Sequence, residues 1–176
     1  NENGIDLRRY PAHILAQVDL EESSYRKAIY RGFGPLADFI FGENLPADRI
    51  SMTTPVQVSR STKIAMTTPV TVSGEGKYTV SFVMPEVYSL ETLPKPKNSS
   101  VRITPVKEST MAVVRFRGFF NHFKIHKAKD RLEKWADEHG LRVTGEFVVA
   151  GYDPPWVPGF LAHNEVMVEV EIAEDK

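Results

Sequence analysis

Histidines and carboxylates are the side chains of this sequence whose types and spacing bear on catalysis or metal binding. His122 and His126 are four residues apart on a predicted helix, a spacing that suits a metal ion. No glutamate follows His122, as the H-E-x-x-H motif of zinc peptidases requires, and both histidines lie off the apolar side of the helix. We therefore expect them on a solvated helix face. Glu43, Glu146 and Glu165 are candidate general bases, but the sequence pairs none of them with a catalytic partner.

Composition and missing motifs exclude several classes of protein. The sequence has no cysteine, so it has no disulfides, thiolate metal sites or cysteine nucleophiles. It contains no G-x-S-x-G nucleophile elbow and no phosphate-binding P-loop. The 22 Lys and Arg residues balance 23 Asp and Glu, and this net charge of −1 argues against a general nucleic-acid-binding protein. We expect a binding protein rather than an enzyme and leave catalysis open.

The sequence says less about membrane insertion, compartment and oligomeric state. No apolar run approaches the length of a transmembrane helix, so we expect no membrane span. The chain begins Asn1-Glu2-Asn3 without a signal-peptide pattern. This start is compatible with a cytoplasmic protein and with an exported protein whose signal has been removed. Both alternatives stay open, as does the oligomeric state.

The pattern of apolar residues predicts one domain over residues 1–176 that combines strands with two helices. The helices are predicted over about 23–42 and 121–140, where apolar residues recur every three or four positions. Gly34 and Pro35 interrupt the first helix, so we expect a kink or a short break there. Alternating apolar and polar residues predict strands elsewhere, most clearly over 166–172.

An internal repeat adds to this prediction. Segment 49–59 contains M-T-T-P-V, and segment 63–73 repeats it with 8 identities in 11 positions. We expect the two copies to form an antiparallel pair of strands. A weaker correspondence relates two halves at roughly 5–92 and 101–173. The expected fold is therefore α+β: a twisted antiparallel sheet or barrel flanked by two helices in a pseudo-twofold repeat, with a groove between sheet and helices.

Six ordered motifs carry a resemblance that covers nearly the whole chain. They are Ile5-Asp6-Leu7-Arg8-Arg9-Tyr10, Phe39-Ile40-Phe41-Gly42-Glu43-Asn44, the two M-T-T-P-V copies, Phe82-Val83-Met84-Pro85 with Leu93-Pro94-Lys95-Pro96, Ala150-Gly151-Tyr152-Asp153-Pro154-Pro155-Trp156, and Asn164-Glu165-Val166. In these motifs the sequence resembles the SOUL/heme-binding protein family. The resemblance implies a twisted β-barrel flanked by two helices, similar to the effector-binding domains of bacterial multidrug-sensing regulators.

The resemblance also implies non-covalent binding of heme or a related tetrapyrrole, with a role as carrier, buffer or sensor. The implied site is a hydrophobic groove beside the first helix. Its residues would be Phe33, Leu36, Ala37, Ile40 and Phe41 on the helix, Arg31 as a partner of the propionates, and Trp156 and His163 in the loop over 156–163.

Axial ligation of the heme iron stays open. Some family members carry a histidine just before the tyrosine of the first motif, but here Arg9 stands at that position and cannot bind iron. His163 is the candidate that we name, and His13, Tyr30 or a methionine are alternatives.

Two other functions fit the same expected fold. An effector-binding or small hydrolytic module would use the same groove for a non-heme ligand, and a glutamate with a raised pKa on the groove floor would indicate it. A protein-interaction module would instead have a filled, shallow groove and a large exposed apolar patch.

Overall fold

The computed structural model describes residues 4–46, 48–51, 56–60, 76–119, 121–152 and 160–172. The elements in chain order are β1 (Ile5–Tyr10), β2 (His13–Glu22), α1 (Tyr25–Ile40), β3 (Asn44–Leu45), β4 (Val56–Arg60), β5 (Gly76–Val83), β6 (Lys95–Pro96), β7 (Arg102–Val106), β8 (Ser109–Arg117), α2 (His122–Glu138), β9 (Leu141–Val143), β10 (Val148–Gly151) and β11 (His163–Ile172).

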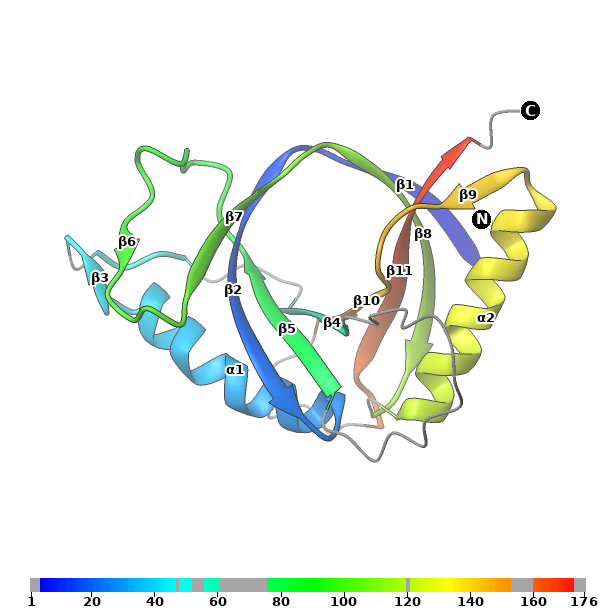
Figure 1. Cartoon of the computed structure of the whole chain (residues 1–176), viewed down its shortest axis with the longest axis horizontal. Coiled ribbons are helices and arrows are strands. Elements are labelled where there is room, and N and C mark those ends of the chain that lie inside the picture. The colour runs from blue at the N-terminus through cyan, green and yellow to red at the C-terminus, as the bar shows by residue number, and fades with distance from the viewer. Residues whose placement is uncertain are drawn as a thin grey trace, which may run out of the picture.

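Most of the described strands join one antiparallel sheet, which has nine strands within the described residues. Its order is β1-β8-β11-β10-β4-β5-β2-β7, and β9 pairs with β11 beside this path. The sheet bends into an arch (Figure 1), but β1 and β7 are its two edges, so it is twisted and open rather than a closed barrel. The predicted α+β fold is thus confirmed in its open-sheet form. Strands β3 and β6 form a separate two-stranded ribbon.

The sheet has the same pattern of strands and connections when it is read from either edge. One edge begins β1, β8, β11, β10 and the other begins β7, β2, β5, β4, and the second strand from each edge leads into a helix. Each half supplies the edge strand of the other, because the early strand β1 pairs with β8 and the later strand β7 pairs with β2. The predicted pseudo-twofold relation is therefore present in the topology.

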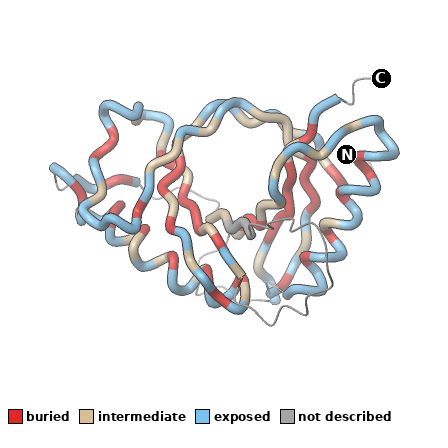
Figure 2. The backbone as a smooth tube through the Cα atoms, viewed as in Figure 1, coloured by how far each residue is buried: buried red, intermediate tan, exposed pale blue. Residues whose placement is uncertain are grey.

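Both helices lie on the outer, convex side of the arch, one beside each half (Figure 1). Buried residues concentrate where the helices face the sheet (Figure 2). The largest fully buried side chains include Leu36, Phe39 and Ile40 of α1 and Leu132 of α2. Removal of these apolar surfaces from water is the main stabilising contribution on this side of the sheet.

Helix α1 continues without interruption through Pro35, so the expected break is absent. At its start, the Ser24 side chain accepts a hydrogen bond from the backbone N–H of Lys27. Pro35 cannot donate the usual helical hydrogen bond. The buried side chains of Leu36 and Ile40, which follow it, hold the second half of the helix against the sheet and offset that loss.

Of the first M-T-T-P-V copy only Val56, the first residue of β4, is among the described residues, and the whole second copy lies outside them. We predicted that the two copies would pair with each other. Strand β4 instead pairs with β5 on one side and with β10 on the other, so both of its sides are occupied at the centre of the sheet.

Candidate functional site

The residues predicted on α1 divide between the core and the surface. Leu36 and Ile40 are fully buried against the sheet. Phe33 is partly buried, and its ring packs edge-on against Phe82 with 5.3 Å between the ring centroids. The crevice between α1 and the sheet is therefore filled by the chain's own side chains.

An exposed row runs along the outer side of α1. Tyr30, Gly34, Ala37 and Phe41 recur at intervals of four, three and four residues, so they lie one above another on the helix surface. The exposed fractions of Tyr30 and Phe41 are 85% and 61%, and Ala37 is half-buried. We call these four residues the α1 row. It is about 16 Å long at the helical rise per residue, which suits one face of a flat aromatic molecule.

Two glycines on α1 have opposite environments. A Cβ on Gly32 would lie 2.7 Å from side-chain atoms of Val80, so this glycine allows the helix to approach β5 closely. Apart from its chain neighbours and the backbone of its own helix, a Cβ on Gly34 would meet no atom of the described residues within 4 Å. Glycine within a helix costs about 1 kcal/mol relative to alanine. Pro35 accounts for a glycine here, because a proline ring crowds the Cβ of the helical residue before it. The side of the helix at Gly34 is open.

The cations of α1 lie toward its first half. Arg26 and Lys27 are exposed in the first turn. Arg31 donates a hydrogen bond to the nearly buried carboxylate of Glu22 at the end of β2, at 2.5 Å. The predicted propionate partner Arg31 is thus already paired, while 65% of its side chain stays exposed.

The remaining predicted residues do not lie on the α1 row. Trp156 lies outside the described residues. His163 is exposed and begins β11 opposite Arg117, at the end of β8 that leads into α2. The Tyr25 and His122 rings are 5.7 Å apart, so α2 begins beside the start of α1, whereas the far end of the α1 row lies about 24 Å further along that helix.

No group of three or more histidine, aspartate or glutamate side chains among the described residues could hold a metal ion. His122 and His126 both lie exposed at the start of α2, as expected of a solvated face. His126 also forms an i,i+4 pair with Asp130, with 3.7 Å between Nδ1 and Oδ1.

A buried carboxylate lies on the inner, concave face of the sheet. Glu165 on β11 is 5% exposed, and its buried neighbour Val166 belongs to the core on the opposite, helix-covered face. Arg8 on β1 donates to both of its oxygens at 3.0 and 3.1 Å. Arg115 on β8 donates through Nε at 3.1 Å, and the hydroxyl of Tyr152 donates at 2.5 Å. We call Glu165, Arg8, Arg115 and Tyr152 the Glu165 network.

The Glu165 network fixes the charge state of the carboxylate. Burial disfavours ionisation, but the hydrogen bonds from Arg8, Tyr152 and Arg115 outweigh it and hold the pKa of Glu165 below its ordinary value. Burial, and then the hydrogen bond to Glu165, raise the pKa of the Tyr152 phenol. An ionised and fully paired glutamate differs from the raised-pKa base expected of a hydrolytic module.

The sequence analysis did not predict the partners of Glu165, although Arg8, Tyr152 and Glu165 each lie in one of the family-like motifs. One signal was available on β1, where Asp6, Arg8 and Tyr10 alternate and so share one face of the strand. That signal does not identify β8 as the strand beside β1, or β11 as the strand beyond it, because the pairing of β1 is set by the exchange of edge strands between the two halves.

A cavity of about 520 Å³ opens at the ends of β1, β9 and β11. Its apolar wall includes Leu7 and Ile172, and three carboxylates border it, Glu108, Glu169 and Glu171. Glu108 pairs with Arg9 and Glu171 pairs with Arg142, so arginines accompany two of the three carboxylates at this border.

A second cavity of about 230 Å³ lies on the concave face. Tyr10, Met111 and Met167 give it an aromatic and thioether wall, and Glu146 and Glu169 supply two carboxylates. Methionine-lined walls adapt to ligands of different shape, and the two carboxylates favour a cation.

Comparison with known families identifies the chain. The model of the SOUL heme-binding protein matches residues 1–169. The chain belongs to the SOUL heme-binding protein family. No curated protein matches the SOUL chain. None of its described helices is long and apolar enough to cross a membrane.

Several solved structures share the fold of this SOUL chain at low sequence identity. The C-terminal domain of EcmrR matches with a TM-score of 0.71 and 13% identity over 95% of this chain and 96% of that one. A hydrolase from Listeria innocua matches with a TM-score of 0.63 and 14% identity over 95% and 91%. SAV2435 bound to tetraphenylphosphonium matches with a TM-score of 0.57 and 11% identity over 95% and 93%. These likenesses concern the fold alone.

Proposed function

We propose that this SOUL-family protein binds heme or a related tetrapyrrole non-covalently on the α1 row, as a carrier, buffer or sensor. The observation that carries the proposal is an exposed row of apolar side chains with open space over Gly34 at its centre. A flat ring over that glycine would contact Tyr30 and Phe41, with Phe33 beside it. Each 100 Å² of apolar surface removed from water contributes about 2.5 kcal/mol, so contact with one ring face already supports useful affinity.

Polar groups near the α1 row suit the propionates and the iron of a heme ligand. Arg26 and Lys27 lie in the turn that precedes Tyr30 and would pair with propionates, and Arg31 would do so only in competition with Glu22. Tyr30 is the side chain of the row with an atom that could bind ferric iron, as tyrosine does in some heme proteins. Bound heme would supply the chemistry of its iron, while the protein supplies the apolar contact and the cations.

Hemin titration followed by absorbance tests the proposal. We expect a saturable shift of the Soret band with one hemin per chain. Gly34→Leu, which fills the open space, and Ala37→Glu, which sets an anion beneath the ring, should each weaken binding by about tenfold or more, equivalent to about 1.4 kcal/mol. Ile172→Ser, at an exposed position of β11 in the other half of the sheet, is the control and should bind as the wild type does.

Two outcomes of the hemin titration would contradict binding at the α1 row. Hemin binding that never saturates, or row variants that bind hemin as tightly as the control, would remove the α1 row as the site. Tyr30→Phe and His163→Ala separate the two candidate axial ligands, because loss of the true ligand changes the Soret position and not only the affinity.

The cavity on the concave face supports a second candidate, the binding of an amphipathic cation by an effector-type module. Its specific support is the combination of Met111 and Met167 with the two carboxylates Glu146 and Glu169. Tetraphenylphosphonium is the probe, since a protein of similar fold binds it. We expect saturable binding that Glu169→Gln weakens and Gly34→Leu leaves unchanged. Hemin competition at the same site, or no saturable binding, would count against this candidate.

A further inference from the structure

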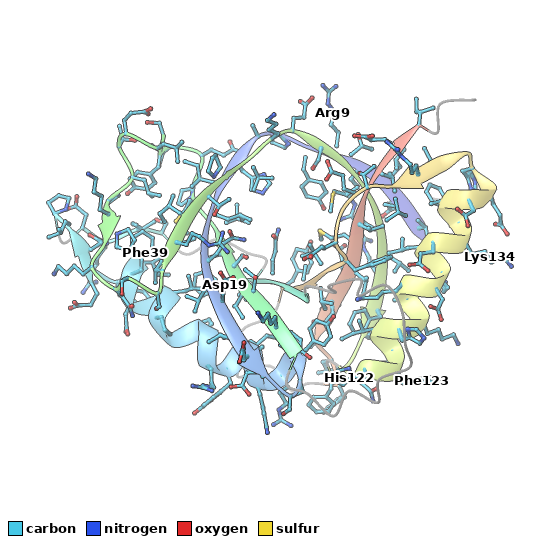
Figure 3. All side chains as sticks on the ribbon, viewed as in Figure 1. Arg9, Asp19, Phe39, His122, Phe123 and Lys134 are labelled. Carbon is cyan, nitrogen blue, oxygen red and sulfur yellow. The ribbon has the colours of Figure 1, made fainter. Side chains whose placement is uncertain are left out.

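Four large apolar side chains are exposed together at the end of the molecule where α2 begins. Phe119, Phe123, Phe160 and Leu161 have exposed fractions of 58%, 73%, 67% and 51%. Figure 3 shows Phe123 at this end, beside His122 on the first turn of α2. We call these four residues the aromatic tip.

The two chain segments that carry the aromatic tip are tied to each other. The backbone N–H of Gly118 donates to the carbonyl of Ala162 at 3.0 Å, and the side-chain amide of the buried Asn164 donates to the carbonyl of Gly118 at 2.6 Å. Phe119 and Leu161 are the direct neighbours of this junction. The tip is therefore a fixed feature of the fold, although its side chains contribute little to the core.

Positive charge lies beside the aromatic tip. Residues 117–129 include one arginine, three lysines and two histidines but no aspartate or glutamate, in a chain whose net charge is −1. Arg117, Lys124 and Lys127 are exposed, and the Nζ of Lys124 donates to the carbonyl of Arg117 at 2.9 Å. Acidic residues return only from Asp130 onward, so the cations concentrate on the end of α2 that carries the tip.

Exposed aromatic side chains next to several cations match the surface of an anionic membrane. Apolar side chains enter the boundary between headgroups and acyl chains, while each nearby lysine or arginine adds electrostatic attraction. Four side chains are too few for a specific protein interface, which buries about 800 Å² on each partner. We propose that the aromatic tip inserts into the surface of anionic phospholipid membranes and holds the protein there peripherally. This proposal is independent of tetrapyrrole binding.

Vesicle flotation tests the proposal. We expect the protein to float with phosphatidylcholine vesicles that contain about 30% phosphatidylserine and to stay in solution with pure phosphatidylcholine, and high salt should release it. In Phe123→Trp, the emission of the added tryptophan should shift to shorter wavelength on the anionic vesicles. The variant Gly34→Leu should bind vesicles as the wild type does, which separates this site from the α1 row.

Matched variants locate the binding to the aromatic tip. Phe119→Ser with Phe123→Ser should lower the partition onto anionic vesicles by about tenfold or more. Val87→Ser with Leu90→Ser removes two exposed apolar side chains elsewhere and should have no effect. Lys127→Gln should lower the partition about fivefold, whereas Lys134→Gln near the other end of α2 should not.

Three results would overturn the proposal. The first is a wild-type protein that does not bind phosphatidylserine vesicles. The second is equal binding by the tip variants and their controls, with unchanged thermal melting to show that all are folded. The third is a wild-type dimer in solution that Phe123→Ser dissociates, because the tip would then be a self-association surface.

Discussion

At the scale of single residues, the Glu165 network joins parts of the chain that are distant in sequence. Its side chains come from β1, β8, β11 and Tyr152, the residue that follows β10, so it ties the exchanged N-terminal strand to the second half. Two guanidiniums and one phenol satisfy the carboxylate, and Asp6 pairs with Arg8 at 3.0 Å to balance the second cation. Loss of one member would leave the others partly buried without a partner, so we expect the network to be sensitive to single substitutions.

Glu165→Gln keeps the shape of the side chain but removes the charge that Arg8 and Arg115 share. We expect a loss of about 3 kcal/mol in the free energy of unfolding, because removal of one partner from a buried ion pair leaves an uncompensated charge. Urea unfolding at neutral pH measures it. Glu171→Gln breaks an exposed pair with Arg142 and should cost less than about 1 kcal/mol. Equal losses in the two variants would contradict a special role for Glu165.

The lowered pKa of Glu165 makes the stability depend on pH in one direction. Its ionised form stabilises the folded protein above the ordinary value of 4.5, and this contribution is lost as the pH falls through the lower value in the folded state. Wild-type stability should therefore decrease more steeply below about pH 4.5 than that of Glu165→Gln, and the two should converge in acid. Thermal melting between pH 7 and 3 follows this, and parallel curves would refute it.

At the scale of elements, α1 has two functional sides, and a pair of substitutions separates them. Gly32→Ala should lower the free energy of unfolding by about 1–2 kcal/mol, because the added Cβ meets Val80 at 2.7 Å. Gly34→Ala should change it by less than about 0.5 kcal/mol, because the helix propensity of alanine is opposed by crowding of its Cβ against the ring of Pro35. Urea unfolding measures both, and a loss at Gly34→Ala as large as that at Gly32→Ala would contradict the packing described.

The end of α1 depends on one buried amide. The Nδ2 of Asn44 donates to the carbonyls of Phe39 and Asp48, both at 2.7 Å, and its Oδ1 accepts from the N–H of Asp48 at 2.8 Å. Asn44→Ala should destabilise the protein by about 2–3 kcal/mol, because it leaves a buried carbonyl without its partner. Asn98→Ala, in an exposed turn, should cost under about 1 kcal/mol in the same calorimetric melt. A small effect at Asn44 would show that water replaces the amide.

Much of the architecture was predictable from residue periodicity. The helix expected over 121–140 is observed as His122–Glu138, and the first as Tyr25–Ile40. The break predicted at Pro35 was wrong. Local propensity favours a break there, whereas burial of the side chains that follow Pro35 is a property of the folded protein and keeps the helix continuous. Leu36 and Ile40 were predicted beside a ligand from the family resemblance, and their apolar character does not distinguish a core side chain from a binding one. That distinction needs the position of α1 on the convex face.

At the scale of the whole molecule, the exchange of edge strands makes each half depend on the other. β1 lies at the start of the sequence but pairs with β8, and β7 follows the middle of the sequence but pairs with β2. The core on the helix side of the sheet includes residues of both α1 and α2. This arrangement explains why a repeat that is weak in sequence is still clear in topology: the pairing, rather than residue identity, preserves the symmetry.

That exchange suggests a use for the fold as a split reporter. A cut in the exposed turn between Asn98 and Ser99 leaves one piece that carries β1 through β6 and another that carries β7 through β11. The first piece lacks β7, which pairs with β2, and the second lacks β1, which pairs with β8. The pairing between β4 and β10 is also divided between the two pieces. Neither fragment should fold alone, and a mixture of the two should recover the circular dichroism of the intact chain by complementation.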